Sequence, residues 1–145
     1  MKKIIPLVGL SMLLAACSSH DKADFVTASD LQHHHWELSA IDGKPVAKNK
    51  LDKVADIEVG ENLNTHGFAG CNSYRGMAEI NAETDEFRVS QMAMTMKMCM
   101  DDSMATERAV ASTLSAWSKI DLDKQTLKLS NDEHTLTFTL KDWVQ

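Results

Sequence analysis

The sequence lacks a second long apolar run, a basic cluster and the short motifs of the common enzyme classes. After the N-terminal leader, no apolar segment approaches the roughly 20 residues that a membrane-spanning helix needs. The formal net charge is −6 and Lys and Arg do not cluster, which argues against nucleic acid as a partner. The sequence contains no G-x-S-x-G, no H-E-x-x-H, no P-loop and no dinucleotide-binding fingerprint. The sequence therefore carries no signature of these large catalytic families.

The first residues have the format of a bacterial lipoprotein signal peptide. Residues 1–3 are positively charged at neutral pH, and the apolar run over residues 4–14 is too short to cross a bilayer. The junction Leu14-Ala15-Ala16-Cys17 resembles the lipobox, in which small residues precede a Cys that takes diacylglycerol. An ordinary signal peptide with a chance Cys is the alternative, but no A-x-A cleavage site is well formed. We therefore expect residues 1–16 to be removed as a signal peptide.

The new N-terminus would then be a lipidated Cys17, with residues 17–30 acting as a flexible tether. The residue after Cys17 is Ser18 and not Asp. By resemblance to the lipoproteins of enteric bacteria, this residue implies a location at the periplasmic face of the outer membrane. Loss of Lys2 and Lys3 takes the formal charge from −6 to −8. The mature chain thus has no polybasic patch for anionic lipid, and we expect its acyl chains, palmitate among them, to attach it to the membrane.

Two cysteines remain once Cys17 is assigned to lipidation. Cys71 and Cys99 form an even pair in an oxidising compartment, which favours a disulfide. The bridge would close a loop of about 29 residues and contribute roughly 3–4 kcal/mol. Two buried free thiols are the alternative. A third hypothesis is thiol chemistry at Cys71 with His66 near it, which would need a reduced, partly exposed sulfur. We expect the bridge, and therefore no enzymatic activity.

Short alternating segments and one helical pattern predict an α+β domain over residues 31–145. Thr27-Ala28-Ser29-Asp30 has the pattern of a capped helical turn. The main helix is expected over residues 101–119, with Met104, Ala111, Leu114 and Trp117 on one face. Strands are expected at residues 35–41, 56–59, 77–80, from 87 into 91–100, 126–129 and 134–140. Without a βαβ rhythm, the sheet should be mostly antiparallel and strongly twisted, packed against the helix.

A run of methionines at every second position is the sharpest local pattern; its members are Met92, Met94, Met96, Met98 and Met100. On a strand they would all point the same way. One hypothesis is a Cu(I)-binding surface, because thioethers are soft ligands, although no His lies within the run. The other is core packing, because Met fills irregular space well and one strand face must be buried. Core packing is the preferred interpretation.

The segment Gly70-Cys71-Asn72-Ser73-Tyr74-Arg75-Gly76, followed by Thr95-Met96-Lys97-Met98-Cys99, resembles the META domain family. That family shows G-C-N-x-Y/F-x-G and, about twenty residues later, T-x-x-x-C. Its W-x-L strand, G-K-P turn and C-terminal L-x-L are matched at residues 36–38, 43–45 and 127–129. The resemblance spans roughly residues 31–140. The density of methionine departs from the family pattern.

The resemblance implies an envelope protein linked to heat shock or antibiotic resistance, without a cofactor, that binds an envelope partner or an apolar ligand. It also implies a β-rich fold with one helix, similar to partly open barrels that hold an acyl tail. Gly70, Asn72, Tyr74, Gly76 and Thr95 would then be structural. A periplasmic copper protein that uses Met92–Met100 remains the alternative.

Overall fold

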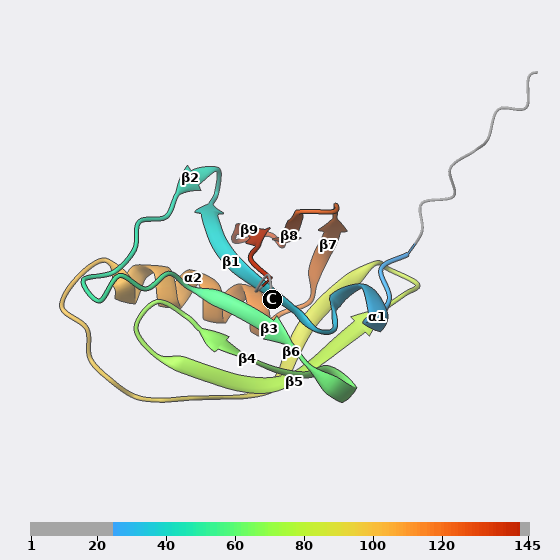
Figure 1. Ribbon diagram of the computed structural model, residues 1–145, viewed down its shortest axis with the longest axis horizontal. Coiled ribbons are helices and arrows are strands. Elements are labelled where there is room, and N and C mark those ends of the chain that lie inside the picture. Colours follow the sequence, from blue (N-terminus) through green and yellow to red (C-terminus); the bar gives the residue numbers. More distant parts are fainter. Residues whose placement is uncertain (1–24, 143–145) are drawn as a thin grey trace, which may run out of the picture.

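The computed structural model describes residues 25–142, which form a β-barrel with one main helix (Figure 1). The predicted signal peptide, Cys17 and the tether up to Asp24 lie outside the described residues. The strands are β1 (His34–Ile41), β2 (Lys44–Pro45), β3 (Asp56–Val59), β4 (Asn64–Phe68), β5 (Ser73–Asn81), β6 (Glu86–Met94), β7 (Ser118–Leu122), β8 (Thr126–Ser130) and β9 (Thr135–Leu140). The helices are α1 (Ala28–Leu31), the 3-10 turn η1 (Glu61–Leu63) and α2 (Ser103–Ser115).

The barrel is closed, whereas the family resemblance had implied a partly open one. Strands β3 to β9 pair in sequence order and antiparallel, and β1 pairs with both β3 and β9. Trp36 of β1 lies opposite Ile57 on one side and opposite Leu140 on the other. Because both edges of β1 are used, the eight-stranded wall has no free edge, and the short β2 only extends β1. The fold is therefore mostly β, and the α+β class fits it only in part.

The core fills the barrel and includes one face of α2. Trp36, Ile57, Phe87 and Phe138 are almost fully buried, each at an alternating position of its strand. Val110 of α2 belongs to the same cluster. The helix therefore packs directly on the barrel, against β6, β8 and β9.

Helix α2 is shorter than predicted, spanning Ser103–Ser115 instead of residues 101–119. Asp102 is its N-cap, and the chain turns extended at Ala116 because β7 begins two residues later. The buried Ser118 hydroxyl donates to the Thr113 carbonyl (3.0 Å), which fixes this exit from the helix. Trp117 consequently leaves the predicted buried face and is 37% exposed. Within residues 25–142, no helix has the length and apolar character of a membrane span.

The predicted capped turn before the barrel is confirmed. The Thr27 backbone N–H donates to the Asp30 carboxylate (2.8 Å), and α1 follows. Leu31, the last residue of α1, is fully buried. Helix α1 therefore begins within the range that we assigned to the tether.

The methionine run does not share one strand face, because β6 contains a bulge and then ends. Phe87 and Val89 point inward, but Gln91 has a φ of +50° and the register with β5 shifts there. The bulge moves the even-numbered Met92 and Met94 to the inner side, where they pack against the core. Gly76 lies opposite, and a Cβ at this position would come within 2.6 Å of the Ser90 carbonyl oxygen.

The remaining methionines follow β6 in residues 95–102, which we call the methionine segment. Met96, Met98 and Met100 are 97%, 81% and 91% exposed. Core packing thus holds for the first two methionines of the run and is wrong for the last three. The error came from assuming one uninterrupted strand, which the bulge and the end of β6 rule out.

Candidate functional site

The two halves of the G-C-N and T-x-x-x-C pattern lie together, and a disulfide joins them. Cys71 and Cys99 are bonded, with their Cα atoms 5.9 Å apart. Cys71 is almost fully buried, and a bonded sulfur is not a thiolate. His66, considered as its base, instead lies near the Glu58 carboxylate (Nε2 to Oε2 3.7 Å). The structure therefore gives no support to thiol chemistry at Cys71.

Asn72 is the central residue of this cluster. Its Oδ1 accepts hydrogen bonds from the Thr95 hydroxyl (2.8 Å) and the Lys97 backbone N–H (2.6 Å). Its Nδ2 donates to the Lys97 carbonyl and to the Glu107 carboxylate, both at 3.0 Å. Both amide protons and both acceptor positions of the buried side chain are thus used. Asn72 joins the start of β5 to the methionine segment and to α2.

Glu107 also accepts a hydrogen bond from the Asn72 backbone N–H. Helical spacing leaves Glu107 off the face that we expected to pack against the sheet, so the pattern assigns its carboxylate no partner. Sequence reasoning missed this residue, because nothing in the spacing between residues 72 and 107 indicates that they meet.

Gly70 and Tyr74 have steric and hydrogen-bonding roles. Gly70 has a φ of +126°, and a Cβ there would lie 2.9 Å from the Ser103 carbonyl oxygen, so α2 begins directly against this backbone. The Tyr74 hydroxyl donates to the Asp56 carbonyl (2.9 Å). Burial raises the pKa of Tyr74 well above its ordinary value, and the nearby Asp56 charge adds to the rise. Tyr74 therefore remains a protonated, structural hydrogen-bond donor at neutral pH.

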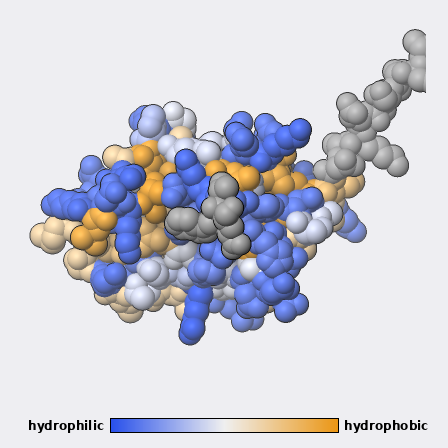
Figure 2. All heavy atoms as spheres, in the orientation of Figure 1, coloured by the Kyte–Doolittle hydropathy of each residue, from blue (hydrophilic) through white to orange (hydrophobic). Residues whose placement is uncertain are grey.

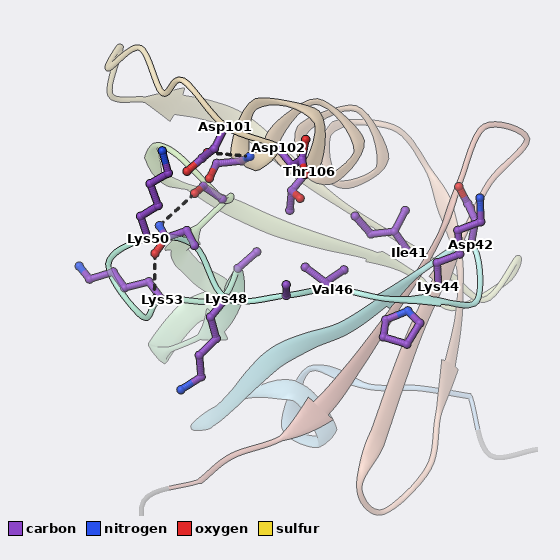
Figure 3. Close-up of a pocket in the computed structure, with 16 residues that line it drawn as sticks. Ile41, Asp42, Lys44, Val46, Lys48, Lys50, Lys53, Asp101, Asp102 and Thr106 are labelled. Carbon is purple, nitrogen blue, oxygen red and sulfur yellow. Dashed lines mark hydrogen bonds between the residues drawn. The ribbon is translucent and has the colours of Figure 1, made fainter.

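A groove of about 530 Å³ lies between residues 46–55, which follow β2, and the start of α2 (Figure 3). Its apolar lining comes from Ile41, Val46, Ala47 and Ala55. Figure 3 shows Ile41, Val46 and Thr106 in the space between that segment and the helix. Figure 2 shows strongly hydrophobic atoms at the surface around β1 and β2, interspersed with hydrophilic ones. The groove thus offers an apolar floor that is open to solvent.

Four lysines within residues 44–53 line this groove, a local cluster that we had not expected in a chain whose net charge is −6. The lining includes four lysines, namely Lys44, Lys48, Lys50 and Lys53, and three aspartates, namely Asp42, Asp101 and Asp102. Lys48 has an ion pair with Asp52 (3.1 Å) that is too exposed to hold it firmly. Lys53 lies 5.8 Å from the centre of the Phe68 ring. All four lysines are exposed, and Figure 3 shows Lys48 and Lys53 extending away from the space between the segment and the helix, so their ammonium groups lie at the outer side of the groove.

Asp42 and Asp101 of the groove are engaged by their own neighbours, whereas the Asp102 side chain makes no capping hydrogen bond. The Thr135 backbone N–H and the His134 ring both bond Asp42 at 2.8 Å and lower the pKa of its carboxyl. Hydrogen bonds from Ser103, including its backbone N–H at 3.0 Å, lower the pKa of Asp101. Asp102 is the N-cap of α2. These carboxylates complete a hairpin and a helix start, so they do not form an acid/base pair.

The described part of the chain does not assemble an evident catalytic centre. In residues 25–142, no three His, Cys, Asp or Glu side chains come together as metal ligands would. Neither His nor Cys lines the groove, so it holds no Ser/His or Cys/His pair. The arrangement is suited to binding.

Comparison with known proteins gives consistent matches. The model of the META domain matches residues 29–143. Heat shock protein HslJ of Escherichia coli (strain K12) is 33% identical over 143 residues, which cover 98% of each chain. A solved NMR structure is 29% identical, covers 83% of this chain and 99% of its own, and superposes with a TM-score of 0.71. Another, of a protein from Burkholderia xenovorans, is 22% identical, covers 96% of this chain and 100% of its own, and has a TM-score of 0.62, a likeness of fold alone.

Proposed function

The chain belongs to the META domain family, and from this premise we propose that it is a stress-related, non-enzymatic binding protein of the bacterial envelope. Its ligand is an apolar molecule with an anionic end, which it binds in the groove between residues 46–55 and α2. The similarity to a heat shock protein supports the link to stress. Cys17 anchors the chain to the periplasmic face of the outer membrane, and the lipobox-like junction supports this location.

The observation that carries the proposal is the chemistry of the groove. The groove has a volume of about 530 Å³ and an apolar floor. Moving a hydrocarbon chain from water onto this floor lowers the free energy by about 25 cal/mol per Å² of apolar surface buried. The surrounding lysines then pair with a carboxylate or phosphate at the end of that chain. A groove of this composition suits a small amphiphile better than a second protein, which needs a larger surface.

The motif residues support a binding role rather than catalysis. The side chain of Asn72 has no hydrogen-bonding capacity left, Cys71 and Cys99 are bonded, and the Tyr74 hydroxyl is occupied. A catalytic group must be able to exchange a proton or attack a substrate, and these groups cannot do so without breaking the cluster. These motif residues instead hold the groove and the methionine segment in place.

The experiment titrates the chain from residue 25, which contains the whole barrel, with sodium decanoate below its micellar concentration. Backbone amide shifts followed by NMR should move at Val46, Ala47 and Thr106. Decyltrimethylammonium, with the same tail and the opposite charge, should bind more weakly. Ala47→Glu places a carboxylate at an exposed position of the floor and should weaken decanoate binding at least tenfold, about 1.4 kcal/mol.

The matched control is Ala93→Glu, an equally exposed alanine that lies opposite Arg75 on the barrel wall. It should bind decanoate like the wild type. Equal binding by Ala47→Glu, or shifts centred away from the groove, would refute the proposed site. The anchor has its own test, because a Cys17→Ala chain that still incorporated radioactive fatty acid would contradict lipidation at Cys17.

A further inference from the structure

We propose that the thioethers of Met96, Met98 and Met100 form a binding site for one Cu(I) ion on the outside of the barrel. None of its three sulfur donors lines the groove, although Asp101 and Asp102, which follow them in the chain, do. It uses none of the His, Cys, Asp or Glu groups that bind most protein metals, and it narrows the five-residue methionine run to its last three members.

The first observation is the exposure of these side chains. Met96, Met98 and Met100 are 97%, 81% and 91% exposed, whereas Met92 and Met94 of the same run pack against the core. Figure 1 shows the segment between β6 and α2 running outside the barrel, clear of the core. Three flexible apolar side chains held in water gain nothing from packing, so packing does not account for them.

The second observation is how the segment is held. Thr95 donates its backbone N–H to the Ser73 carbonyl (3.0 Å), and Lys97 hydrogen-bonds Asn72 through both its N–H and its carbonyl. Cys99 is bonded to Cys71. The odd-numbered residues are therefore tied to the barrel at three successive points. Met96 and Met98 lie between these points and Met100 follows them, and all three side chains project into solvent.

This arrangement brings neighbouring sulfur donors within reach of one ion, because Met98 can pair with Met96 on one side or with Met100 on the other. Alternate residues of an extended segment lie about 6.6–7 Å apart. Each methionine side chain has three rotatable bonds, so neighbouring sulfur atoms can turn towards a common point between them. Because the backbone is already fixed by Asn72 and the disulfide, binding orders side chains only, which lowers its entropic cost.

The donor set selects the ion. Neutral thioethers are soft ligands that favour Cu(I) and offer little to Mg²⁺, Ca²⁺ or Mn²⁺, which prefer oxygen. Asp101 and Asp102 follow Met100 directly and place negative charge beside a bound cation. An apolar protein partner is the competing occupant of these side chains, and it would not require sulfur.

The experiment uses Ag(I) in chloride-free buffer as a probe, because it shares the preference of Cu(I) for sulfur and leaves the disulfide intact. Calorimetry on the protein should show that one ion binds per chain with sub-micromolar affinity. A variant with Met96, Met98 and Met100 all changed to Leu keeps size and apolar character, and it should lose at least 100-fold in affinity. The matched control changes Met92 and Met94 to Leu and should bind as the wild type does.

Native mass spectrometry with Cu(I) under argon should give the same one-to-one complex and the same ranking of variants. Unchanged Ag(I) binding in the triple Leu variant, or binding without a defined stoichiometry, overturns the proposal. Circular dichroism of the triple variant checks that its barrel is intact, and exposed Met→Leu changes should leave it so. Decanoate binding by this variant should be unaffected, so failure here is distinguishable from failure of the groove.

Discussion

Two irregular segments meet at Gly70 and Cys71, and they are held very differently. The methionine segment is joined to the barrel by a disulfide and by the hydrogen bonds of Asn72. Residues 46–55 are organised mainly by Asn49, whose Oδ1 accepts from the Leu51 and Lys53 backbone N–H groups. The hydrogen bond between that side chain and the motif is longer, from Asn49 Nδ2 to the Gly70 carbonyl at 3.4 Å.

The difference suits the two proposed ligands. A metal ion needs donors held close to their final positions, and the methionine segment has a backbone fixed at three points. An amphiphile of variable length needs a wall that can shift, and residues 46–55 form a locally bonded turn that can move as a unit. One sequence motif therefore anchors a rigid segment and a looser one.

The largest expected effect comes from removing the covalent link. Replacing both Cys71 and Cys99 with Ser should lower the free energy of unfolding by about 3–4 kcal/mol, because the denatured chain is no longer constrained. Urea denaturation followed by tryptophan fluorescence measures the change. Wild type in reductant should shift by a similar amount. A loss near zero would mean that Asn72 alone holds the segment.

A smaller effect is expected for Asn72→Ala. This change removes four side-chain hydrogen bonds, one of them to the Glu107 carboxylate, and leaves buried groups unpaired. We expect a loss of about 2–3 kcal/mol in the free energy of unfolding, with faster hydrogen exchange at the Lys97 amide. Thr95→Val removes one of these bonds, together with the exposed bond that the Thr95 hydroxyl accepts from the Ser73 N–H (3.2 Å), and as the control it should cost about 1 kcal/mol. Equal losses in the two variants would contradict a central role for Asn72.

The smallest effect is expected for Asn49→Ala, which tests the looser segment. Its bonds are local and partly exposed, so we expect a loss of about 1 kcal/mol or less. Hydrogen exchange should accelerate at the Leu51 and Lys53 amides and stay unchanged at Lys97. If protection at Lys97 fell as well, the two segments would be one coupled unit, and the comparison drawn above would not hold.

Much of what was predicted correctly about the fold came from patterns of neighbouring residues. The cap formed by Thr27 and Asp30, the alternation in β1, β8 and β9 and the pairing of Cys71 with Cys99 were all expected. The end of α2 was not, because helical spacing continues to Trp117 although the chain must turn to start β7. The bulge at Gln91 was also missed, since a period of two in the sequence does not reveal where a strand changes its inner face.

By itself, the sequence determined the even cysteine pair, the strand alternation and the helix start to within two residues, because each depends on residues close together or on simple parity. Only the tertiary structure decided that β1 closes against β9, that Glu107 completes the bonding of Asn72, and that residues 46–55 and α2 enclose a groove. It also decided that three methionines face solvent. These features depend on contacts between residues far apart in the chain, and the periodicity within each segment carries no information about them.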